Sequence, residues 1–184
     1  MEMSKNLEQT SKFLSYVLRH KPDEIGLALD QHGWANIEEL IARASTHGTR
    51  LNMELIEEVV ETSDKRRFII DDEGTRIRAN QGHSIPVDLD LKPVTSPDVL
   101  YHGTATRFLE SIRETGLQPR SRHHVHLSAN RETAAAVGAR HGKLIVLEVD
   151  AAGMAAAGHV FFVSANGVWL SHHIPPVFIG FSSE

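Results

Sequence analysis

Apolar residues in the first third of the chain recur at the spacing of amphipathic helices. Residues 7–20 carry one apolar stripe and stop before Pro22, because the residue before a proline is kept out of helical conformation. Two further helices are expected to start at Asn36 and Asn52, and a Glu three positions after Asn36 completes an N-cap signature. The positions expected inside are Phe13, Leu14, Val17, Leu18, Ile37, Leu40, Ile41, Leu55, Ile56 and Val59.

The pattern then changes to that of short strands. Residues 65–70 and 75–79 predict two strands around the turn DDEG, which together form a hairpin. Three helices followed by a basic hairpin is the order of a winged-helix domain, a nucleic-acid-binding design related to helix-turn-helix modules. The sequence therefore predicts a winged-helix lobe over residues 1–84.

The rest of the chain predicts a connector and a second lobe. Residues 85–99 hold three prolines and little periodicity, with room for a short strand at 87–91. The expected fold class is α+β, with residues 100–184 as the second lobe. Its expected elements are a strand at 100–102, a helix at 103–117 that stops at Gly116, a strand at 123–128, a helix at 129–142, a strand at 143–149, a hairpin at 161–171 about Asn166-Gly167, and a last strand at 176–181.

Composition agrees with this two-lobed α+β fold and excludes some classes of function. The 184 residues are 41% hydrophobic and 23% charged, as in a folded protein of one or two domains. With no cysteine, no bilayer-length apolar run and no signal-peptide core, we expect a cytoplasmic protein without disulfides or thiolate zinc sites. A net charge of −5 argues against coating long stretches of duplex, although a pocket for one or a few phosphates stays open.

Basic residues cluster at the C-terminal end of the predicted first helix and in the hairpin. The planar fork of arginine suits phosphate oxygens, which favours a phosphate site. Charges on a helix end and a hairpin are also typical of a solvated surface, so the pattern alone leaves both interpretations open. The residues concerned are Arg19, His20, Arg66, Arg67, Arg76 and Arg78.

The chain has 12 histidines, and they bunch rather than scatter. In a strand, His124 and His126 point to one face, which Arg122 shares, so anion handling fits better than a metal site without an acidic partner motif. YHGT, residues 101–104, places a glycine and a hydroxyl at the expected mouth of a helix, where backbone N–H groups favour an anion. No glycine-rich phosphate loop and no G-x-S-x-G motif occurs, which argues against kinases, dehydrogenases and serine hydrolases.

Eight stretches, taken in order, resemble the RNA 2′-phosphotransferase family, the NAD-dependent tRNA splicing enzymes and their bacterial relatives. They extend from about residue 10 to 172 and read TSKFLSYVLRHKP, GWANIEEL, TSDKRRF, IRANQGHS, YHGT, RHHVHLS, VGARHG and NGVWLS. A single stretch would be unspecific, whereas all of them in this order are highly specific. The resemblance implies a winged-helix RNA lobe and an NAD-binding lobe like that of ADP-ribosyltransferases.

The resemblance also implies which residues act. The family's essential set falls on Arg19, His20, Arg67 and Arg122, with Arg66 the neighbouring choice for the third member. The NAD co-substrate would be bound by His102, Gly103, Thr104, His126 and Ser128, and the RNA by Lys65, Arg66, Arg78, Gln81 and His83. No metal ion is expected, because the arginines supply the positive charge, and a monomer is the default expectation. NGVWLS holds no acid where many ADP-ribosyltransferases carry a catalytic glutamate, which argues against protein ADP-ribosylation.

The implied reaction moves an internal 2′-phosphate of RNA to NAD in two steps. The phosphate displaces nicotinamide, and the ADP-ribose 2″-hydroxyl then expels the RNA as its 2′-alcohol, leaving ADP-ribose 1″,2″-cyclic phosphate. His20 is expected to act as general acid or base. Two alternatives stay open: ADP-ribosylation of terminal phosphates of RNA or DNA, and a winged-helix binding module without catalytic activity.

Overall fold

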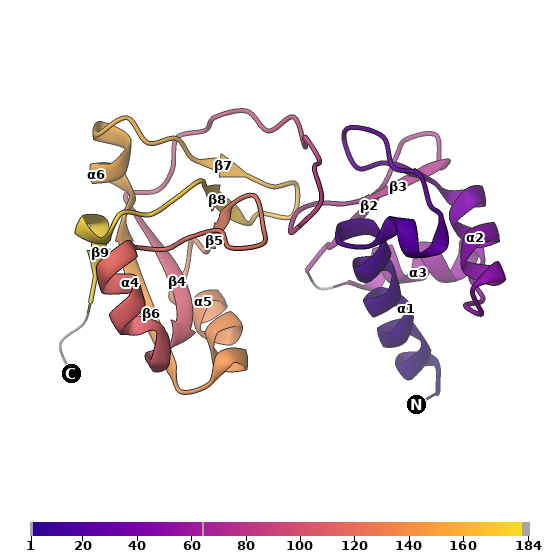
Figure 1. The fold of residues 1–184 in the computed structure, drawn as a ribbon, viewed down its shortest axis with the longest axis horizontal. Coiled ribbons are helices and arrows are strands. Elements are labelled where there is room, and N and C mark those ends of the chain that lie inside the picture. Colours follow the sequence, from indigo (N-terminus) through magenta and orange to yellow (C-terminus); the bar gives the residue numbers. More distant parts are fainter. Residues whose placement is uncertain (1, 64, 182–184) are drawn as a thin grey trace. The chain divides into compact units, whose positions relative to one another are not determined.

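The chain folds into two compact units, each with its own hydrophobic core (Figure 1). The structure, a computed structural model, describes residues 2–63 and 65–181. Unit 1 extends to Asp90 and unit 2 begins at Leu91. Both combine helices with small antiparallel sheets, which confirms the expected α+β class. None of the helices in the described residues has the length and apolarity that a membrane span requires.

Unit 1 contains three helices and one three-stranded sheet. The N-caps predicted at Asn36 and Asn52 are confirmed, since their side chains accept hydrogen bonds from the N–H groups of Glu39 and Leu55 over 2.9 and 2.8 Å. The elements are α1 (Glu2–Arg19), a 3-10 turn (Pro22–Ile25), β1 (Ala35–Asn36), α2 (Ile37–Thr46), α3 (Met53–Thr62), β2 (Phe68–Ile70) and β3 (Arg76–Ala79).

The apolar stripes of the three helices meet in the core of unit 1. Leu14, Leu18, Leu40 and Ile56 are each 0% exposed, as the helical spacing predicts. The inner face of the sheet closes the core, with Ile77 at its centre. Burial of these side chains fixes α1 and β3, which carry Arg19, Arg76 and Arg78.

The sheet of unit 1 has the strand order β1-β3-β2. The predicted hairpin is confirmed, because β2 and β3 pair antiparallel with Phe68 opposite Ala79. β1 was not predicted: its two residues pair with β3, which places Ala35 opposite Ile77. Two residues carry no periodicity of their own, so a strand of this length is defined by its partner.

Unit 2 contains two three-stranded sheets, ordered β4-β6-β9 and β5-β8-β7, with short helices around them (Figure 1). The hairpin about Asn166-Gly167 is confirmed as β7 and β8. The elements are β4 (Val99–Ala105), a 3-10 turn (Thr106–Phe108), α4 (Leu109–Thr115), β5 (Val125–Leu127), α5 (Arg131–Gly138), a 3-10 turn (Ala139–His141), β6 (Leu144–Asp150), α6 (Ala151–Ala156), β7 (Phe162–Val163), β8 (Trp169–Ser171), a 3-10 turn (Pro176–Phe178) and β9 (Ile179–Gly180).

The expected helix mouth at YHGT is wrong. β4 continues through Gly103 and Thr104 to Ala105, and all seven of its residues pair with β6. The helical segment starts only at Thr106. Backbone N–H groups at Gly103 and Thr104 therefore lie within a strand rather than at a helix start, which removes the basis for an anion site there.

Four smaller expectations also differ from the structure. α1 begins at Glu2 rather than near residue 7, residues 87–91 form no strand, the last strand is only two residues long, and α6 was not predicted. The alternation at 87–91 has no strand beside it to pair with. Instead, the N–H of Asp88 donates to the carbonyl of Gln31 in unit 1.

Two glycines allow β4 and α5 to pack in direct backbone contact. A Cβ added at Gly138 would lie 2.6 Å from the Gly103 carbonyl carbon and from the Thr104 nitrogen. A Cβ added at Gly103 would lie 1.7 Å from the Ala134 carbonyl oxygen. No flexible side chain relieves these contacts, so the strand that carries His102 depends on glycine at both positions.

We expect Gly138→Ala to lower the free energy of unfolding by about 2–3 kcal/mol, because the added methyl forces β4 and α5 apart. Urea unfolding followed by circular dichroism measures the loss. The matched control is Gly180→Ala, where an added Cβ meets Glu148 at 3.6 Å, an ordinary contact. Equal effects of the two substitutions would contradict the close-packing account.

Candidate functional site

In unit 1, the C-terminal end of α1 is tied to the loop that follows β3. The N–H of Ser84 donates to the Arg19 carbonyl over 2.9 Å, and His20 Nδ1 hydrogen-bonds the Ser84 hydroxyl over 2.8 Å. The Arg19 side chain runs along Gly82, where an added Cβ would lie 3.5 Å from its Cζ and Nε. Gly82 has φ +88°, a conformation that glycine adopts without strain. The half-buried Arg19 and His20 therefore hold defined positions against this loop.

A turn in an uncommon conformation precedes β2 and carries Arg66 and Arg67. Arg66 has φ +42°, and its carbonyl accepts a 2.6 Å hydrogen bond from Asn80 Nδ2. The Asn80 N–H donates to the Arg67 carbonyl over 2.9 Å. Asn80 is 6% exposed, so these bonds are shielded from water. Asn80 thus fixes the backbone of the half-buried Arg67, while Lys65 and Arg66 are exposed.

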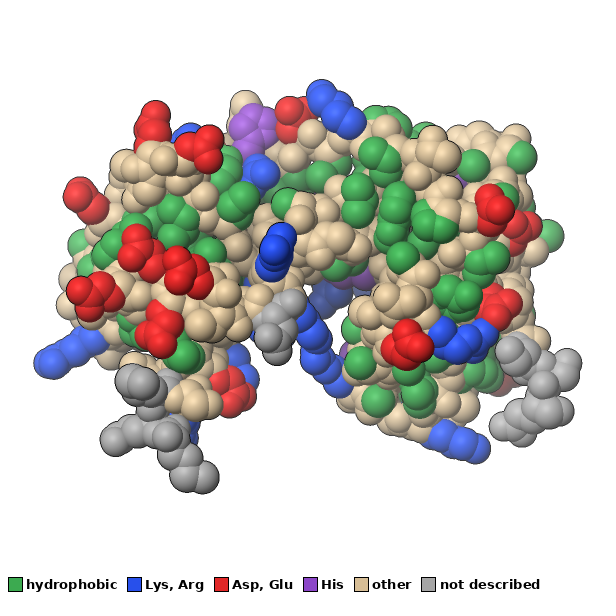
Figure 2. All heavy atoms as spheres, turned by 180° about the vertical axis from the view of Figure 1, so that it is seen from behind, with side chains coloured by type: hydrophobic (Ala, Val, Ile, Leu, Met, Phe, Trp, Pro, Cys, Tyr) green, Lys and Arg blue, Asp and Glu red, His purple; other side chains and the backbone are tan. Residues whose placement is uncertain are grey.

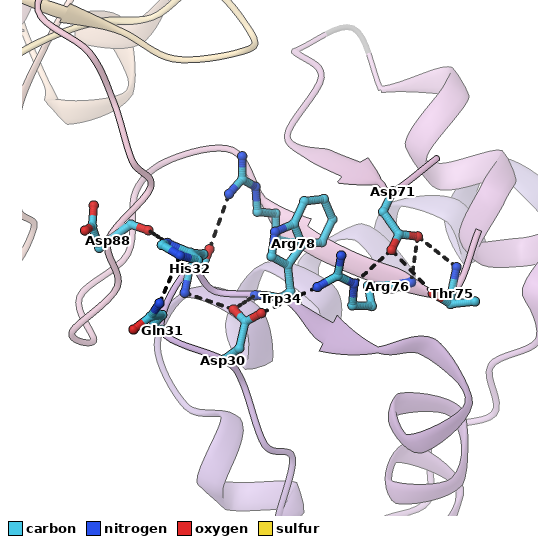
Figure 3. A network of polar contacts seen from close by, with 9 residues as sticks. All are labelled: Asp30, Gln31, His32, Trp34, Asp71, Thr75, Arg76, Arg78 and Asp88. Carbon is cyan, nitrogen blue, oxygen red and sulfur yellow. Dashed lines mark hydrogen bonds and ion pairs between the residues drawn. The ribbon is translucent and has the colours of Figure 1, made fainter. Parts of the chain in front are cut away.

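The outer face of the unit 1 sheet stacks two arginines on a tryptophan. Arg78 Cζ lies 4.6 Å and Arg76 Cζ 5.3 Å from the centroid of the Trp34 ring, within the range of cation–π contacts (Figure 3). Arg76 also bonds Asp71 over 2.8 Å and holds the pKa of that carboxyl at about 2. Arg78 forms no ion pair within residues 2–63 and 65–181, and partial burial lowers its pKa. The two neighbouring arginines thus differ in how their charge is balanced.

Many acidic side chains of unit 1 lie on its helices, and others lie in its loops and in the turn of the hairpin. Figure 2 shows several of them gathered on the face of unit 1 that it presents. The exposed ones on α2 and α3 are Glu38, Glu54, Glu57, Glu58 and Glu61. The arginines of the candidate site come from the end of α1 and from the hairpin rather than from α2 and α3, so a chain of net charge −5 can offer a locally positive surface.

In unit 2, β4 and β5 are joined beside His102. Tyr101 and Ser128 exchange two backbone hydrogen bonds of 2.8 and 2.9 Å, and His102 Nδ1 donates to the His126 carbonyl over 2.9 Å. Because a carbonyl only accepts, the Nδ1 atom carries the proton and Nε2 is an acceptor in the neutral ring. Burial, the largest influence, lowers the pKa of His102. The ring is therefore neutral at pH 7 and offers an acceptor at Nε2.

Arg122 belongs to the same group through His126. Its Nη1 donates to His126 Nδ1 over 3.2 Å, so the two side chains are in contact. Arg122 itself lies in the bend before β5 (Val125–Leu127), outside the strand whose alternation was expected to put both side chains on one face. A guanidinium only donates, which makes Nδ1 of His126 the acceptor. Gly103 and Thr104, also predicted at this site, are buried within β4.

His124 forms an aromatic cluster next to this group. Its ring centroid lies 5.5 Å from that of Phe162 and 5.0 Å from that of His172. Burial, with the charges of His172 and His123, lowers the pKa of His124 to about 4. The folded chain therefore holds His124 neutral over a pH range in which an exposed histidine is charged.

The sequence prediction missed three residues that position the candidate site. Asn80, Ser84 and Trp34 act through contacts with residues distant in the sequence. Their only signal in the sequence is that they lie within the motif stretches GWANIEEL and IRANQGHS. Of the other predicted residues, Gln81 is half-buried and His83 is 3% exposed. No group of three or more His, Asp or Glu side chains suited to a metal ion occurs in the described part of the chain.

The sequence model of the RNA 2′-phosphotransferase, Tpt1 / KptA family matches residues 5–173, which span both units. The chain therefore belongs to this family, and the resemblance seen in its motifs is confirmed. The match includes the end of α1, the hairpin and the joined strands β4 and β5.

Curated relatives from diverse bacteria cover the chain almost completely. A protein of Acaryochloris marina named probable RNA 2′-phosphotransferase is 58% identical over 173 residues, which is 94% of this chain and 96% of the relative. Proteins of the same name from Pseudomonas aeruginosa and Streptomyces coelicolor are each 56% identical, the first over 95% of this chain and 97% of its own length, the second over 94% of both. The chain is thus similar to these proteins over their whole length.

The lowered pKa of His124 predicts acid sensitivity. The unfolded chain binds a proton near pH 6.5 that the folded chain accepts only near pH 4, so the free energy of unfolding falls as the pH drops through this window. His124→Phe keeps the ring and removes the titration. Between about pH 7.5 and about pH 4.5, urea unfolding of wild type should lose about 2 kcal/mol more than that of the variant. Equal losses would show that His124 titrates normally.

Proposed function

We propose that this chain transfers an internal 2′-phosphate of RNA to NAD and releases the RNA with a 2′-hydroxyl. The observation that carries the proposal is the family match over residues 5–173. The relatives of 56–58% identity are named probable RNA 2′-phosphotransferases. NAD is a co-substrate in this scheme, and the charge on the phosphate is balanced by arginines rather than by a metal ion.

In the first step, the 2′-phosphate attacks the anomeric carbon of the NAD ribose, and the bond to nicotinamide breaks. The phosphate is already an anionic nucleophile, and nicotinamide leaves as a neutral ring. A strong general base is therefore unnecessary, which agrees with the lack of an acidic residue in β7, β8 and the turn between them. The product is RNA joined through its 2′-phosphate to ADP-ribose.

In the second step, the 2″-hydroxyl of the ADP-ribose attacks the same phosphorus. The bond from phosphorus to the RNA 2′-oxygen breaks, and this oxygen takes a proton to become the 2′-alcohol. The other product is ADP-ribose 1″,2″-cyclic phosphate. Negative charge builds on the phosphoryl oxygens in this step, so cationic donors contribute most here.

The proposed catalytic residues are Arg19, His20, Arg67 and Arg122. Arginine offers paired N–H donors to phosphoryl oxygens and stays charged throughout. His20, oriented by its hydrogen bond to Ser84, is the proposed general acid or base, since an imidazole can take either role near neutral pH. The proposed contacts to RNA outside the reacting phosphate are Lys65, Arg66, Arg78, Gln81 and His83.

The donors and acceptors of unit 2 suit the sugar of NAD. His102 Nε2 is an acceptor for a ribose hydroxyl, and its ring is held by the His126 carbonyl. Ser128 adds a hydroxyl on the neighbouring strand. Gly103 and Thr104 are proposed to serve this site indirectly, as the buried part of β4 beside His102.

The finer fold assignments follow the same proposal. Unit 1 has the element order of a winged helix, with three helices and a hairpin whose second strand also pairs with β1. Unit 2, with its two small antiparallel sheets, is proposed to be the ADP-ribosyltransferase-like lobe. These assignments place RNA binding in unit 1 and NAD binding in unit 2.

The direct test is to incubate the protein with NAD and an RNA that bears one internal 2′-phosphate. We expect NAD-dependent conversion of the RNA to its 2′-hydroxyl form, with one nicotinamide released for each phosphate removed. A parallel reaction with a terminally phosphorylated RNA tests the alternative ADP-ribosylation. Stable modification of the terminal phosphate without conversion of the internal one would favour that alternative, and binding without chemistry would contradict both.

Removing Arg122 should slow the second step more than the first. By analogy with loss of an oxyanion donor, Arg122→Ala is expected to cost about 3–4 kcal/mol of transition-state stabilisation, a rate loss of about 10²–10³-fold. RNA joined to ADP-ribose should then accumulate, as followed by gel electrophoresis in a single turnover. Arg113→Ala on α4 is the control and should leave turnover unchanged. An Arg122→Ala variant that releases no nicotinamide at all would contradict the assignment to step two.

Asn80 should matter for activity because it holds the turn of Arg66 and Arg67. Asn80→Ala and the cap variant Asn52→Ala each remove one hydrogen bond of unit 1, and each should lower the free energy of unfolding by about 1 kcal/mol. Only Asn80→Ala should reduce kcat, by about tenfold, with little change in the KM for NAD. Equal kcat values for the two variants would show that Asn80 serves stability alone.

A further inference from the structure

Arg78 stands in the middle of the unit 1 sheet between two apolar side chains. On β2, Ile69 is directly opposite Arg78. On the other side, continuing the pairing of Ala35 with Ile77 by one residue places Trp34 opposite Arg78. Residues that face each other across neighbouring strands point to the same side of a sheet. Trp34 and Ile69 therefore flank the Arg78 side chain, which accounts for its partial burial.

The polar atoms of Arg78 are poorly satisfied. Its Nη1 reaches only the His32 carbonyl, at 3.5 Å, which is the long limit of a hydrogen bond (Figure 3). Its Nε is buried and has no hydrogen-bond partner among the described residues. Burying a charged group without hydrogen-bond partners costs free energy, and an anion placed against the guanidinium would offset that cost.

Arg76, two residues earlier on the same face, differs from Arg78 because its charge is paired with carboxylates of the same unit. Asp71 accepts its Nε–H over 2.8 Å, Asp30 lies 3.7 Å from its Nη1, and the pKa of Arg76 is raised, chiefly by the bond to Asp71. Figure 3 shows both carboxylates turned toward Arg76. The charge of Asp30 also raises the pKa of Arg78 against the lowering by burial, but no carboxylate of the described residues lies within ion-pair distance of Arg78. The fold therefore pairs Arg76 with carboxylates and leaves Arg78 able to bind an external anion.

We propose that Arg78, held against Trp34, binds a phosphodiester group of the RNA strand beside the nucleotide that carries the reacting 2′-phosphate. This inference rests on the proposed function, which supplies an RNA with phosphodiesters on both sides of that nucleotide. Trp34 is a positioning residue here: its ring orients the guanidinium without contacting the phosphate.

The chain distance keeps Arg78 within reach of an RNA strand that is bound by the proposed catalytic residues of unit 1. Gly82, against which the Arg19 side chain packs, follows Arg78 by four residues, so their Cα atoms are at most about 14 Å apart. The loop between them carries Asn80, which holds the turn of Arg67. Arg78 is thus connected by a short loop to the part of unit 1 that holds the proposed catalytic residues. It lies on β3, beside Trp34.

The test measures RNA binding without NAD, by fluorescence anisotropy of two labelled RNAs that share one internal 2′-phosphate. One has natural linkages, and the other has uncharged methylphosphonate linkages at the positions next to the 2′-phosphate. Arg78→Gln should weaken binding of the natural RNA about tenfold and reduce the slope of log K against log salt by about 1. It should leave binding of the methylphosphonate RNA unchanged.

Two variants separate the binding role from charge and from folding. Arg43→Gln on α2 removes an arginine that lies 3.7 Å from Glu39, and it should bind both RNAs as wild type does. Trp34→Leu should weaken binding of the natural RNA, but less than Arg78→Gln does. Trp34→Phe should bind the natural RNA almost as tightly as wild type, because it keeps an aromatic ring under Arg78. The subsite is overturned if Arg78→Gln weakens binding of both RNAs by the same factor, or if it weakens binding of neither.

Turnover then distinguishes this inference from the proposed function. If the chain transfers 2′-phosphates, Arg78→Gln should raise the KM for RNA about tenfold and leave kcat unchanged. A fall in kcat with an unchanged KM would place Arg78 in the chemistry instead and overturn the subsite. If wild type transfers no 2′-phosphate, the proposed function fails, and the anisotropy result still decides whether Arg78 reads a flanking phosphodiester.

Discussion

The hydrogen bonds between the end of α1 and the loop after β3 are the constraint on which the candidate site of unit 1 depends. The Ser84 N–H caps the carbonyl of Arg19, the Ser84 hydroxyl orients His20, and Gly82 lets the Arg19 side chain lie directly on the loop backbone. The arginine and the histidine at this helix end hold defined positions, because the Arg19 side chain packs against Gly82 and the His20 ring bonds the Ser84 hydroxyl. Complementation of the helix dipole alone would require none of these contacts.

Charge and proton positions are specified by local partners throughout both units. Arg76 is balanced by Asp71, whereas Arg78 is stacked on Trp34 without a carboxylate. In unit 2, the His126 carbonyl sets the proton of His102 on Nδ1 and leaves Nε2 to accept. A chain of net charge −5 can therefore offer local positive charge to an RNA phosphate, since Arg78 has no ion-pair partner among the described residues.

The parts of the fold that follow from local signals could be predicted from the sequence. The three helices of unit 1, their asparagine caps and both hairpins were confirmed, because periodicity and turn residues specify them. β1 and the extension of β4 through Gly103 could not, because they exist only through pairing with a distant strand. The motifs also named candidate residues such as Arg19 and His102, but the supporting contacts of Asn80 and Trp34 are tertiary and have no counterpart in sequence spacing.

The measurement that tests the central claim most directly follows the phosphorus atom itself. An RNA with a radiolabelled internal 2′-phosphate is mixed with excess protein and NAD, and the label is traced through a single turnover. The account predicts that all label passes into RNA joined to ADP-ribose and then into ADP-ribose 1″,2″-cyclic phosphate. Label released as inorganic phosphate, or label that stays in the RNA while NAD is consumed, would contradict a phosphate transfer by this chain.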